Sequence, residues 1–298
     1  MSLKHWFGRT AAALAALGLS SAAPAKAPQQ ARPALWSVSD ADTTIYLFGT
    51  IHLLPDKADW RSAAFNRAVD GSQELVIETK VDEKDPTKIL GALASLAFSK
   101  GLPPLKDRVP KDKQAALEAA VKRSGFPPAA LDQMETWAVA VMLLGGQFAE
   151  LDLKVGQGVE TVLKTEFDGR GKSIGELETN VEQFTFFDRL SEKSQRELLE
   201  GAIEPSKEVR EEFSSMMRAW SSGDIKTIAK AFNRDLAGSP ELAESLIFQR
   251  NANWVKWIEQ RMAKPGTVMV AVGAGHLAGD KSVIDLLERQ GVKVQRIQ

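Results

Sequence analysis

The sequence predicts an α/β protein whose mixed central sheet is built from N- and C-terminal segments, with a large helical insertion between them. Three observations predict this class. Strand-like patterns at 35–48 and 74–79 flank one helical pattern early in the chain, and a strand–turn–helix–strand order closes the chain from residue 267. Between them, from about residue 83 to 264, the apolar spacing is almost entirely helical.

The composition is that of a globular protein. Of 298 residues, 44% are hydrophobic and 26% are charged, so the chain can bury a sizeable core. The formal charge is −1, and it becomes −3 without a leader that carries Lys4 and Arg9. This near balance argues against nucleic acid as a partner. The absence of cysteine excludes disulfides, thiolate metal sites and a cysteine nucleophile.

The first residues have the pattern of a secretory signal peptide, which we place at residues 1–25. Lys4 and Arg9 form a basic start, Ala11–Leu19 an apolar core and Ala23-Pro24-Ala25 an exit site. The alternative is an anchor that is never cleaved, but the apolar run is shorter than the about 20 residues that a span needs. We therefore expect no stable membrane span after cleavage, and a bacterial protein that is periplasmic or secreted.

Residues 26–34 are rich in Pro, Ala and Gln and are predicted to be a linker. The remainder, 35–298, is predicted to be a single domain. Residues 35–82 and 265–298 form its sheet core in this interpretation, and residues 83–264 form the mainly helical insertion.

The sheet core begins with a predicted hairpin. Leu35–Ser39 and Thr43–Phe48 alternate between apolar and polar residues around the turn Asp40-Ala41-Asp42. His52 follows the second strand. A helix with apolar residues on one side is predicted over Trp60–Asp70.

Glu74–Thr79 is predicted to be the next strand. The strand–helix–strand order indicates a right-handed crossover, which places this strand beside the one that precedes His52. Strand alternation puts Val76 and Glu78 on one face, so Glu78 is a carboxylate at a strand's carboxyl end on an otherwise apolar face. His52 and Glu78 are therefore expected to converge.

Helical spacing predicts a series of helices in the insertion, interrupted by a short strand at Lys172–Leu177: Asp85–Ser99, Lys111–Ser124, Pro128–Glu150, Gly158–Phe167, Val181–Leu190, Glu192–Ala202, Lys207–Trp220, Ile225–Asp235 and Glu241–Ala263. The Trp, Phe and Met residues of this region are predicted to pack between helices. Arg250, Trp254 and Trp257 share one helical stripe, which could bring Arg250 toward the sheet, but spacing alone favours a surface salt bridge for Arg250.

The C-terminal segment predicts a compact βαβ unit. Thr267–Val272 is a buried strand, Gly273–Gly275 a turn, Asp280–Gln290 a helix and Val292–Ile297 a final strand. The glycines lack the G-x-G-x-x-G spacing of a dinucleotide site. No G-x-S-x-G elbow is present, which argues against a serine hydrolase.

Two short stretches share one pattern: Gly49-Thr50-Ile51-His52 and Gly273-Ala274-Gly275-His276. Each follows a strand and places a glycine three residues before a histidine, and these are two of only three histidines in the chain. Open α/β sheets carry ligand-binding side chains on the turns at the carboxyl ends of their strands. If the two strands are neighbours, both histidines face one crevice.

Five blocks, in this order, resemble the TraB/PrgY/GumN family, and most of all its exported, GumN-like bacterial branch. They are Leu47–Leu53, the strand ending at Glu78, Leu177-Glu178-Thr179 with Gln183, Arg250-Asn251, and Val272–Leu277. The resemblance runs from about Leu35 to the C-terminus. It implies an α/β core shared with Tiki-type metalloproteases and, more distantly, with erythromycin esterases and haem-binding ChaN proteins.

The resemblance also implies a site. In Tiki proteins the paired G-x-x-H motifs and an acidic residue serve a divalent-metal peptidase, and the matching positions here are His52, Glu78 and His276. Arg250 matches a basic position that related hydrolases place near the site. Glu160 stands where relatives commonly have Asp.

The chemistry of these residue types supports a metal site. Two neutral imidazoles and a carboxylate suit a divalent ion such as Mn, Co or Zn with open positions, which lowers the pKa of a bound water. A metal-free version is also open, in which Glu78 activates water and a histidine with Arg250 stabilises the oxyanion. Glu160 and Glu178 are expected to be structural or supporting groups.

The leading hypothesis is a metal-dependent hydrolase of the cell envelope that acts on peptide or amide bonds. Its catalytic residues would be Glu78, His52, His276 and Arg250, and its substrate a peptide or small molecule. The alternative is a non-catalytic periplasmic protein that captures a peptide, haem or metal in the same crevice. A third interpretation, a purely structural envelope protein, predicts that loss of both histidines leaves function intact.

Overall fold

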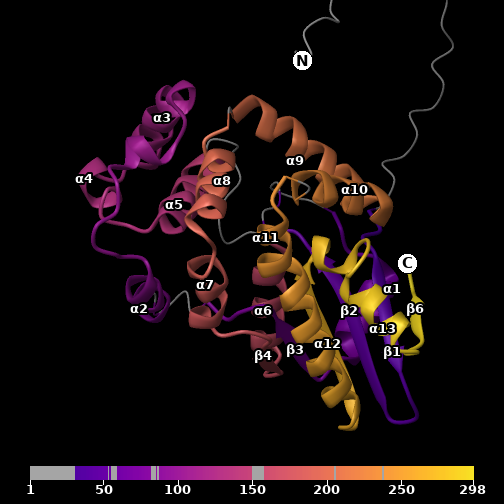
Figure 1. Ribbon diagram of the computed structural model, residues 1–298. Helices are drawn as coiled ribbons and strands as arrows, with labels where there is room; N and C mark the ends of the chain where they lie inside the picture. The colour runs from indigo at the N-terminus through magenta and orange to yellow at the C-terminus, as the bar shows by residue number, and fades with distance from the viewer. Residues whose placement is uncertain are drawn as a thin grey trace, which may run out of the picture.

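The structure is a computed structural model that describes residues 31–52, 54, 59–81, 85, 87–149, 158–204, 206–236 and 238–298. The predicted signal peptide, and the predicted linker up to residue 30, lie outside the described residues. Figure 1 shows a twisted sheet with helices packed against it and a separate group of helices to one side.

The described residues include one mixed sheet of six strands, in the spatial order β4-β3-β5-β2-β1-β6. The strands are β1 Leu35–Ser39, β2 Thr43–Thr50, β3 Glu74–Ile77, β4 Ser173–Glu176, β5 Gly266–Gly273 and β6 Val294–Arg296. The predicted fold class is thus confirmed, because strands from both ends of the chain share the sheet.

The first two strands form the predicted antiparallel hairpin, with Leu35 opposite Phe48 and Ser39 opposite Thr44. Its turn is closed by Asp40, whose Oδ1 accepts hydrogen bonds from the N–H groups of Asp42 at 3.1 Å and Thr43 at 2.8 Å.

The strands that precede the two G-x-x-H turns, β2 and β5, are parallel neighbours, as expected. The expectation that β3 lies beside β2 is wrong, because β5 lies between them and is parallel to both. The side chains of Val268–Val272 are all buried, and a strand that is apolar on both faces belongs in the centre of a sheet. His52 and Glu78 nevertheless follow parallel strands and lie at the same edge.

The two C-terminal strands, β5 and β6, do not lie side by side as the predicted compact βαβ unit implies. β6 pairs with β1 at the far edge of the sheet, so β2 and β1 separate β5 from β6. The final helix is also shorter than expected, because the Ser282 hydroxyl caps it by accepting from Asp285 N–H.

The helices that the structure describes follow the predicted series with different bounds. They are α1 Ala63–Gly71, α2 Thr87–Leu96, α3 Gln114–Ser124, α4 Pro128–Leu131, α5 Thr136–Ala149, α6 Val159–Gly169, α7 Asn180–Asp188, α8 Glu192–Ala202, α9 Ser206–Ser221, α10 Ile225–Leu236, α11 Pro240–Ala243, α12 Gln249–Met262 and α13 Val283–Arg289.

The helix predicted over Pro128–Glu150 is two helices, α4 and α5, and its last residue lies outside the described part of the chain. The buried guanidinium of Arg108 donates to the carbonyls of Asp132 at 2.7 Å and Met134 at 2.6 Å. These carbonyls therefore accept hydrogen bonds from a side chain instead of from the backbone N–H groups of a continuing helix. The helix predicted over Glu241–Ala263 also divides, because a π-helical turn at Glu244–Phe248 separates α11 from α12.

Helices cover both faces of the sheet. On one face, residues of α1, α6, α9 and α10 pack around Phe48 and Leu75. On the other face, residues of α12 and α13 pack around Val76 and Val270. Leu75 and Val76 therefore point to opposite faces, as the alternation predicts.

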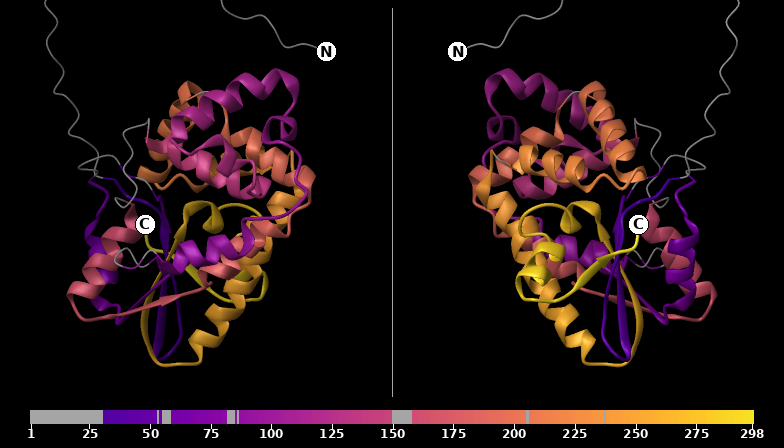
Figure 2. Two further views of the ribbon diagram at one scale, coloured as in Figure 1. Left: turned by 90° about the vertical axis from the view of Figure 1, so that its left-hand side faces the viewer. Right: turned by 90° about the vertical axis from the view of Figure 1, so that its right-hand side faces the viewer.

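A third apolar core lies away from the sheet, between α3, α5 and α8. Trp137 is fully buried there and stacks near Phe184 and Phe187 of α7, which confirms the helix-packing role predicted for such residues. Figure 2 shows this group of helices above the strands in both views. The insertion is not wholly separate from the sheet core. Its strand β4 is part of the sheet, and its helices α6 and α12 pack against the faces of the sheet.

Among the described residues, no helix is both long and apolar enough to cross a membrane. The division at residues 35–82, 83–264 and 265–298 stays a prediction.

Candidate functional site

The parallel strands β2, β5 and β3 end at one edge of the sheet, and this edge carries the predicted site residues. Thr50 at the end of β2 pairs with Gly273 at the end of β5, and His52 and His276 follow two and three residues later. Glu78 follows β3, whose last residue pairs with Ala271 of β5.

The three predicted ligand residues meet around Gly273. The point that a Cβ atom on Gly273 would occupy lies 3.2 Å from Glu78 Oε1, 3.6 Å from His276 Cδ2 and 4.0 Å from His52 Nε2. A side chain at this position would fill the space between the three groups, which explains why the chain has glycine here. The structure thus brings together side chains that lie far apart in the sequence.

Glu78 is buried and both of its oxygens accept hydrogen bonds. Only 8% of its surface is exposed. Oε1 accepts from Gly273 N–H at 2.7 Å, and Oε2 accepts from Arg250 Nη2 at 2.7 Å. Burial alone would raise the pKa of this carboxyl, but nearby positive charge and the Gly273 N–H hold it well below its usual range. Because His276 is itself uncharged near neutral pH, Arg250 is the main cause of this decrease.

Arg250, near the start of α12, is buried with 8% of its surface exposed, so the surface salt bridge predicted from spacing is wrong. Its Nε donates to both oxygens of Glu178 at 3.0 Å, and Nη2 lies between Glu78 and Glu178. Its guanidinium carbon lies 4.8 Å from the ring centre of Trp254, one helical turn later on the same stripe. The stripe therefore faces the sheet.

Glu178 supports Arg250 from the end of β4. Its Oε1 also accepts from Trp254 Nε1 at 2.9 Å, and its N–H donates to the carbonyl of Glu78 at 2.9 Å. Burial raises the pKa of Glu178, although its bonds to Arg250 oppose the increase. This agrees with the supporting role expected from the sequence.

His276 is held in one tautomer. Its Nε2 lies 3.3 Å from Arg250 Nη1, and since a guanidinium only donates, this Nε2 carries the lone pair. Nδ1 therefore carries the proton and donates to Asn251 Oδ1 at 2.7 Å. Burial, with the nearby positive charges, lowers the pKa of His276 to about 3. Asn251 is a site residue that sequence reasoning missed, although its pairing with Arg250 in one of the five blocks marked the position.

His52 is oriented by α6. Its Nδ1 lies 2.9 Å from Glu160 Oε1, which also accepts from the Thr50 hydroxyl. The hydrogen bond to Glu160 raises the pKa of His52 to about 9. Since 68% of the His52 side chain is exposed, water screens part of this attraction.

The approach of α6 to this turn is close. Val159 N–H donates to the carbonyl of Ile51 at 3.1 Å. A Cβ atom on Gly158 would lie 2.2 Å from the carbonyl oxygen of His52, so this position requires glycine. On the other side, Trp220 Nε1 of α9 donates to the carbonyl of Gly49 at 2.8 Å.

The two imidazoles are arranged alike. Each has its Nδ1 held by an oxygen, from Glu160 or from Asn251, which directs Nε2 away from that partner. Metal-binding histidines in proteins have this arrangement, with an outer oxygen fixing ring orientation and tautomer. The donor set of two imidazoles and a carboxylate therefore fits a divalent ion.

One feature opposes metal binding in the present arrangement. Arg250 already donates to Glu78 Oε2 and faces His276 Nε2. Among the residues that the structure describes, no group of three or more His, Asp or Glu side chains could hold a metal ion as placed. An ion would have to compete with Arg250 for these atoms.

Comparison with known proteins relates the whole domain to one family. The sequence model of the TraB/PrgY/gumN family matches residues 34–296. The uncharacterized protein YbaP of Escherichia coli (strain K12) is 23% identical over 260 residues, which cover 86% of this chain and 92% of YbaP. A Metalloprotease TIKI homolog of Amphimedon queenslandica is 22% identical, over 88% of this chain and 61% of its own length. No solved structure matches.

Proposed function

Because this chain belongs to the TraB/PrgY/gumN family, we propose that it is a metal-dependent hydrolase that cleaves peptide or amide bonds. One observation carries the proposal. The Nε2 atom of His52, the Oε1 atom of Glu78 and the ring of His276 all lie within 4.0 Å of one point beside Gly273. The similarity to a metalloprotease homologue supports the same chemistry.

In this proposal, His52 Nε2, His276 Nε2 and the Glu78 carboxylate hold the ion. Such a set suits Mn, Co or Zn and leaves open positions for water and substrate. The ion would supply a water of lowered pKa and would polarise the carbonyl to be attacked.

The other residues prepare these ligands. Glu160 and Asn251 fix the rings of His52 and His276 through Nδ1, which leaves Nε2 of each ring as the atom that would bind the ion. At His276, Arg250 would have to be displaced from Nε2. Arg250 and the Gly273 N–H keep Glu78 ionised at neutral pH, as a ligand must be. The pKa of His52, raised to about 9, means that an ion must displace a proton there.

Arg250 has two roles in the proposal. It stabilises the ionised Glu78, and it provides a fixed positive charge next to the reacting centre, where an oxyanion develops during amide hydrolysis. Glu178 and Trp254 keep the guanidinium in place when a substrate binds.

Hydrolysis without a metal is less well supported. A general base works best when its pKa is near the working pH, and the pKa of Glu78, which Arg250 holds well below its usual range, makes it a weak base. His276 has the same weakness, because its pKa is about 3.

The second candidate function is a binding protein without catalysis. One observation favours it: Arg250 already occupies hydrogen-bonding positions on Glu78 and His276, two of the three proposed ligands. Such a site would capture a peptide, haem or metal in the same crevice without turnover.

We also propose that the protein is exported to the bacterial periplasm or exterior. The support is the signal-peptide pattern of residues 1–25, so the proposed substrates are those of the cell envelope. Fractionation of cells that express the full chain tests this, and an uncleaved protein in the cytoplasm would contradict it.

The deciding experiment uses the purified chain. Its metal content is measured, and hydrolysis of a peptide library is followed before and after chelation and after return of Mn, Co or Zn. We expect about one ion per chain and turnover that chelation stops. The variants His52→Ala, His276→Ala and Glu78→Gln should lose more than the roughly 10- to 100-fold that loss of an outer-shell partner costs. Lys256→Gln, on the exposed side of α12, serves as the control. Tight ligand binding without turnover would favour the binding protein.

A further inference from the structure

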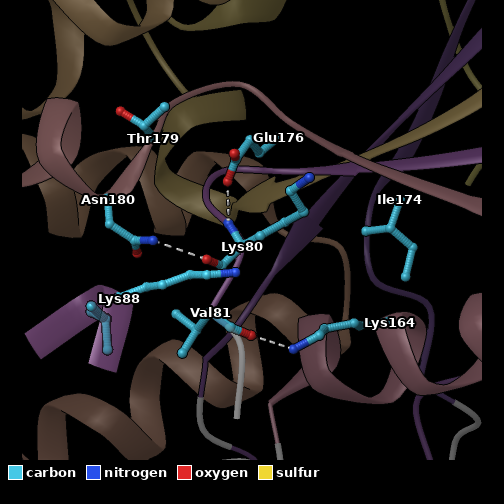
Figure 3. A pocket seen from close by; sticks show the side chains of 9 residues that line it. Lys80, Val81, Lys88, Lys164, Ile174, Glu176, Thr179 and Asn180 are labelled. Carbon is cyan, nitrogen blue, oxygen red and sulfur yellow. Dashed lines mark hydrogen bonds between the residues drawn. The ribbon is translucent and has the colours of Figure 1, made fainter. Parts of the chain in front are cut away.

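A pocket lies at the same edge of the sheet, beyond the ends of β3 and β4. Its volume is about 440 Å³. Lysines reach it from three elements: Lys80 follows β3, Lys88 lies in α2 and Lys164 in α6. Figure 3 shows their side chains around one space. This cluster has no role in the site described above.

The pocket adjoins the proposed site along two routes. Lys80 is two residues after Glu78, which places their Cα atoms within about 7 Å of each other. Lys164 is four residues after Glu160 on α6, so the two side chains share one face of the helix, one turn apart. Glu160 contacts His52. A ligand at the proposed site is therefore within reach of the lysine pocket.

Among the described residues that line the pocket, positive charge exceeds negative charge: there are three lysines and one carboxylate, Glu176. Glu176 Oε2 accepts a hydrogen bond from the backbone N–H of Lys80 at 2.7 Å. Lys164 is half-buried and donates to the carbonyl of Val81. Within the described part of the chain, the exposed ammonium groups of Lys80 and Lys88 have no carboxylate within salt-bridge distance.

The pocket wall is held by hydrogen bonds and is partly apolar. Asn180 Nδ2 donates to the carbonyl of Lys80 at 3.1 Å and its Oδ1 accepts from the Thr79 hydroxyl, so the segment that carries Lys80 is tied to α7. Ile89 and Ile174 add apolar surface. A short aliphatic stem that ends in a negative charge matches such surroundings.

We propose that this pocket is a subsite for a carboxylate of the substrate, held by Lys80 and Lys88. The proposal rests on the proposed hydrolase and specifies its substrate class: an acidic peptide, bound through a Glu or Asp side chain or through a C-terminal carboxylate. Lysines act here as flexible point charges, which suits a carboxylate on a mobile chain.

The test measures binding, not turnover. Three peptides with a neutral fluorescent dye are titrated in chelator by fluorescence anisotropy: an amidated peptide with two glutamates, its copy with glutamines, and the glutamine copy with a free C-terminal carboxylate. We expect one of the carboxylate peptides to bind roughly three- to tenfold more tightly than the neutral copy, as partly exposed ion pairs give. If the peptide with two glutamates binds more tightly, the pocket takes a side-chain carboxylate. If the peptide with the free C-terminus binds more tightly, it takes a C-terminal carboxylate. The preference should shrink with added salt.

Variants locate the preference. Lys80→Gln with Lys88→Gln should remove it, whereas Lys256→Gln, on exposed α12 surface, should retain it. Lys88→Gln alone is the second variant in case the double variant does not fold. Equal binding of all three peptides, or a preference that survives both lysine variants, would overturn the subsite.

Failure of the subsite and failure of the hydrolase give different results. A carboxylate preference that persists in His276→Ala, in a protein that cleaves nothing, leaves the subsite standing and removes the enzyme. Metal-dependent cleavage with equal binding of acidic and neutral peptides leaves the enzyme standing and removes the subsite.

Discussion

Arg250 binds Glu78 through one nitrogen that it shares with a second carboxylate: Nη2 lies 2.7 Å from Glu78 Oε2 and 2.8 Å from Glu178 Oε2. The two carboxylates follow neighbouring strands and are both buried. Without Arg250, two negative charges would face each other in a region shielded from water. The guanidinium thus stabilises the fold at the point where the proposed ligands meet.

Arg250→Met should therefore destabilise the protein strongly. Removing one partner of a buried ion pair leaves an uncompensated charge and costs about 3–5 kcal/mol in the free energy of unfolding. Urea unfolding at neutral pH measures the change. Arg289→Met is the control, because its pair with Asp285 is largely exposed, and it should change stability by less than about 0.5 kcal/mol. A loss under about 1 kcal/mol for Arg250→Met would show that the network is not essential to the fold.

The pH dependence of stability should reflect the two histidines in opposite ways. His276 is buried uncharged, and its pKa is lowered from 6.5 to about 3, so the unfolded chain binds more protons as the pH falls below 6.5. Stability is then lost on the acid side. The pKa of His52 is raised to about 9, so its contribution is present below 6.5 and is lost as the pH rises through 9.

The measurement is the urea midpoint as a function of pH. Between pH 6.5 and 4.5, His276 titrates in the unfolded chain before the carboxyl of Glu78 does. The pKa values of His52 and Glu178 are also shifted, so the contribution of His276 is read from the difference between the wild type and a His276 variant. His276→Gln should flatten the decrease in this window. An unchanged slope would mean that His276 is protonated in the folded protein.

The sequence predicted the parts of the site that depend on local patterns. Alternation placed Glu78 on the same face as Val76, and the G-x-x-H turns placed His52 and His276 at the carboxyl ends of parallel neighbours. These conclusions needed only a strand's period and the direction of its chain. The catalytic and metal-binding roles of these residues remain proposals.

The parts that the sequence did not predict depend on distant contacts. The burial of Arg250 is set by Glu78, 172 residues earlier, and Glu178, 72 residues earlier. Spacing within one helix carries no information about such partners. The central place of β5 has a similar cause, because a crossover from β2 to β3 is compatible with either adjacent strands or a strand inserted later between them.

Glu160→Gln should lower the pKa of His52 toward 6.5, because the hydrogen bond to the Glu160 carboxylate is the largest cause of its increase. If His52 is a metal ligand, the affinity for Mn, Co or Zn should also decrease by about 10- to 100-fold. NMR titration of the imidazole signals measures the pKa, and competition with a chelator measures the affinity. Glu166→Gln, on the same helix and paired with Arg61, is the control. A His52 pKa that does not change would contradict the assigned hydrogen bond.

Gly158→Ala should displace the turn that carries His52. The added Cβ would lie 2.2 Å from the His52 carbonyl oxygen, and backbone atoms cannot move aside as a flexible side chain can. Forcing α6 and this turn apart should cost about 1–3 kcal/mol, as other overpacked positions do. It should also lower the His52 pKa, because Glu160 moves with α6. Gly201→Ala in α8 is the matched control, since its Cβ would meet nothing within 4 Å and alanine favours a helix. If both variants show the same stability and the same histidine titration as the wild type, α6 does not hold His52 as the structure indicates.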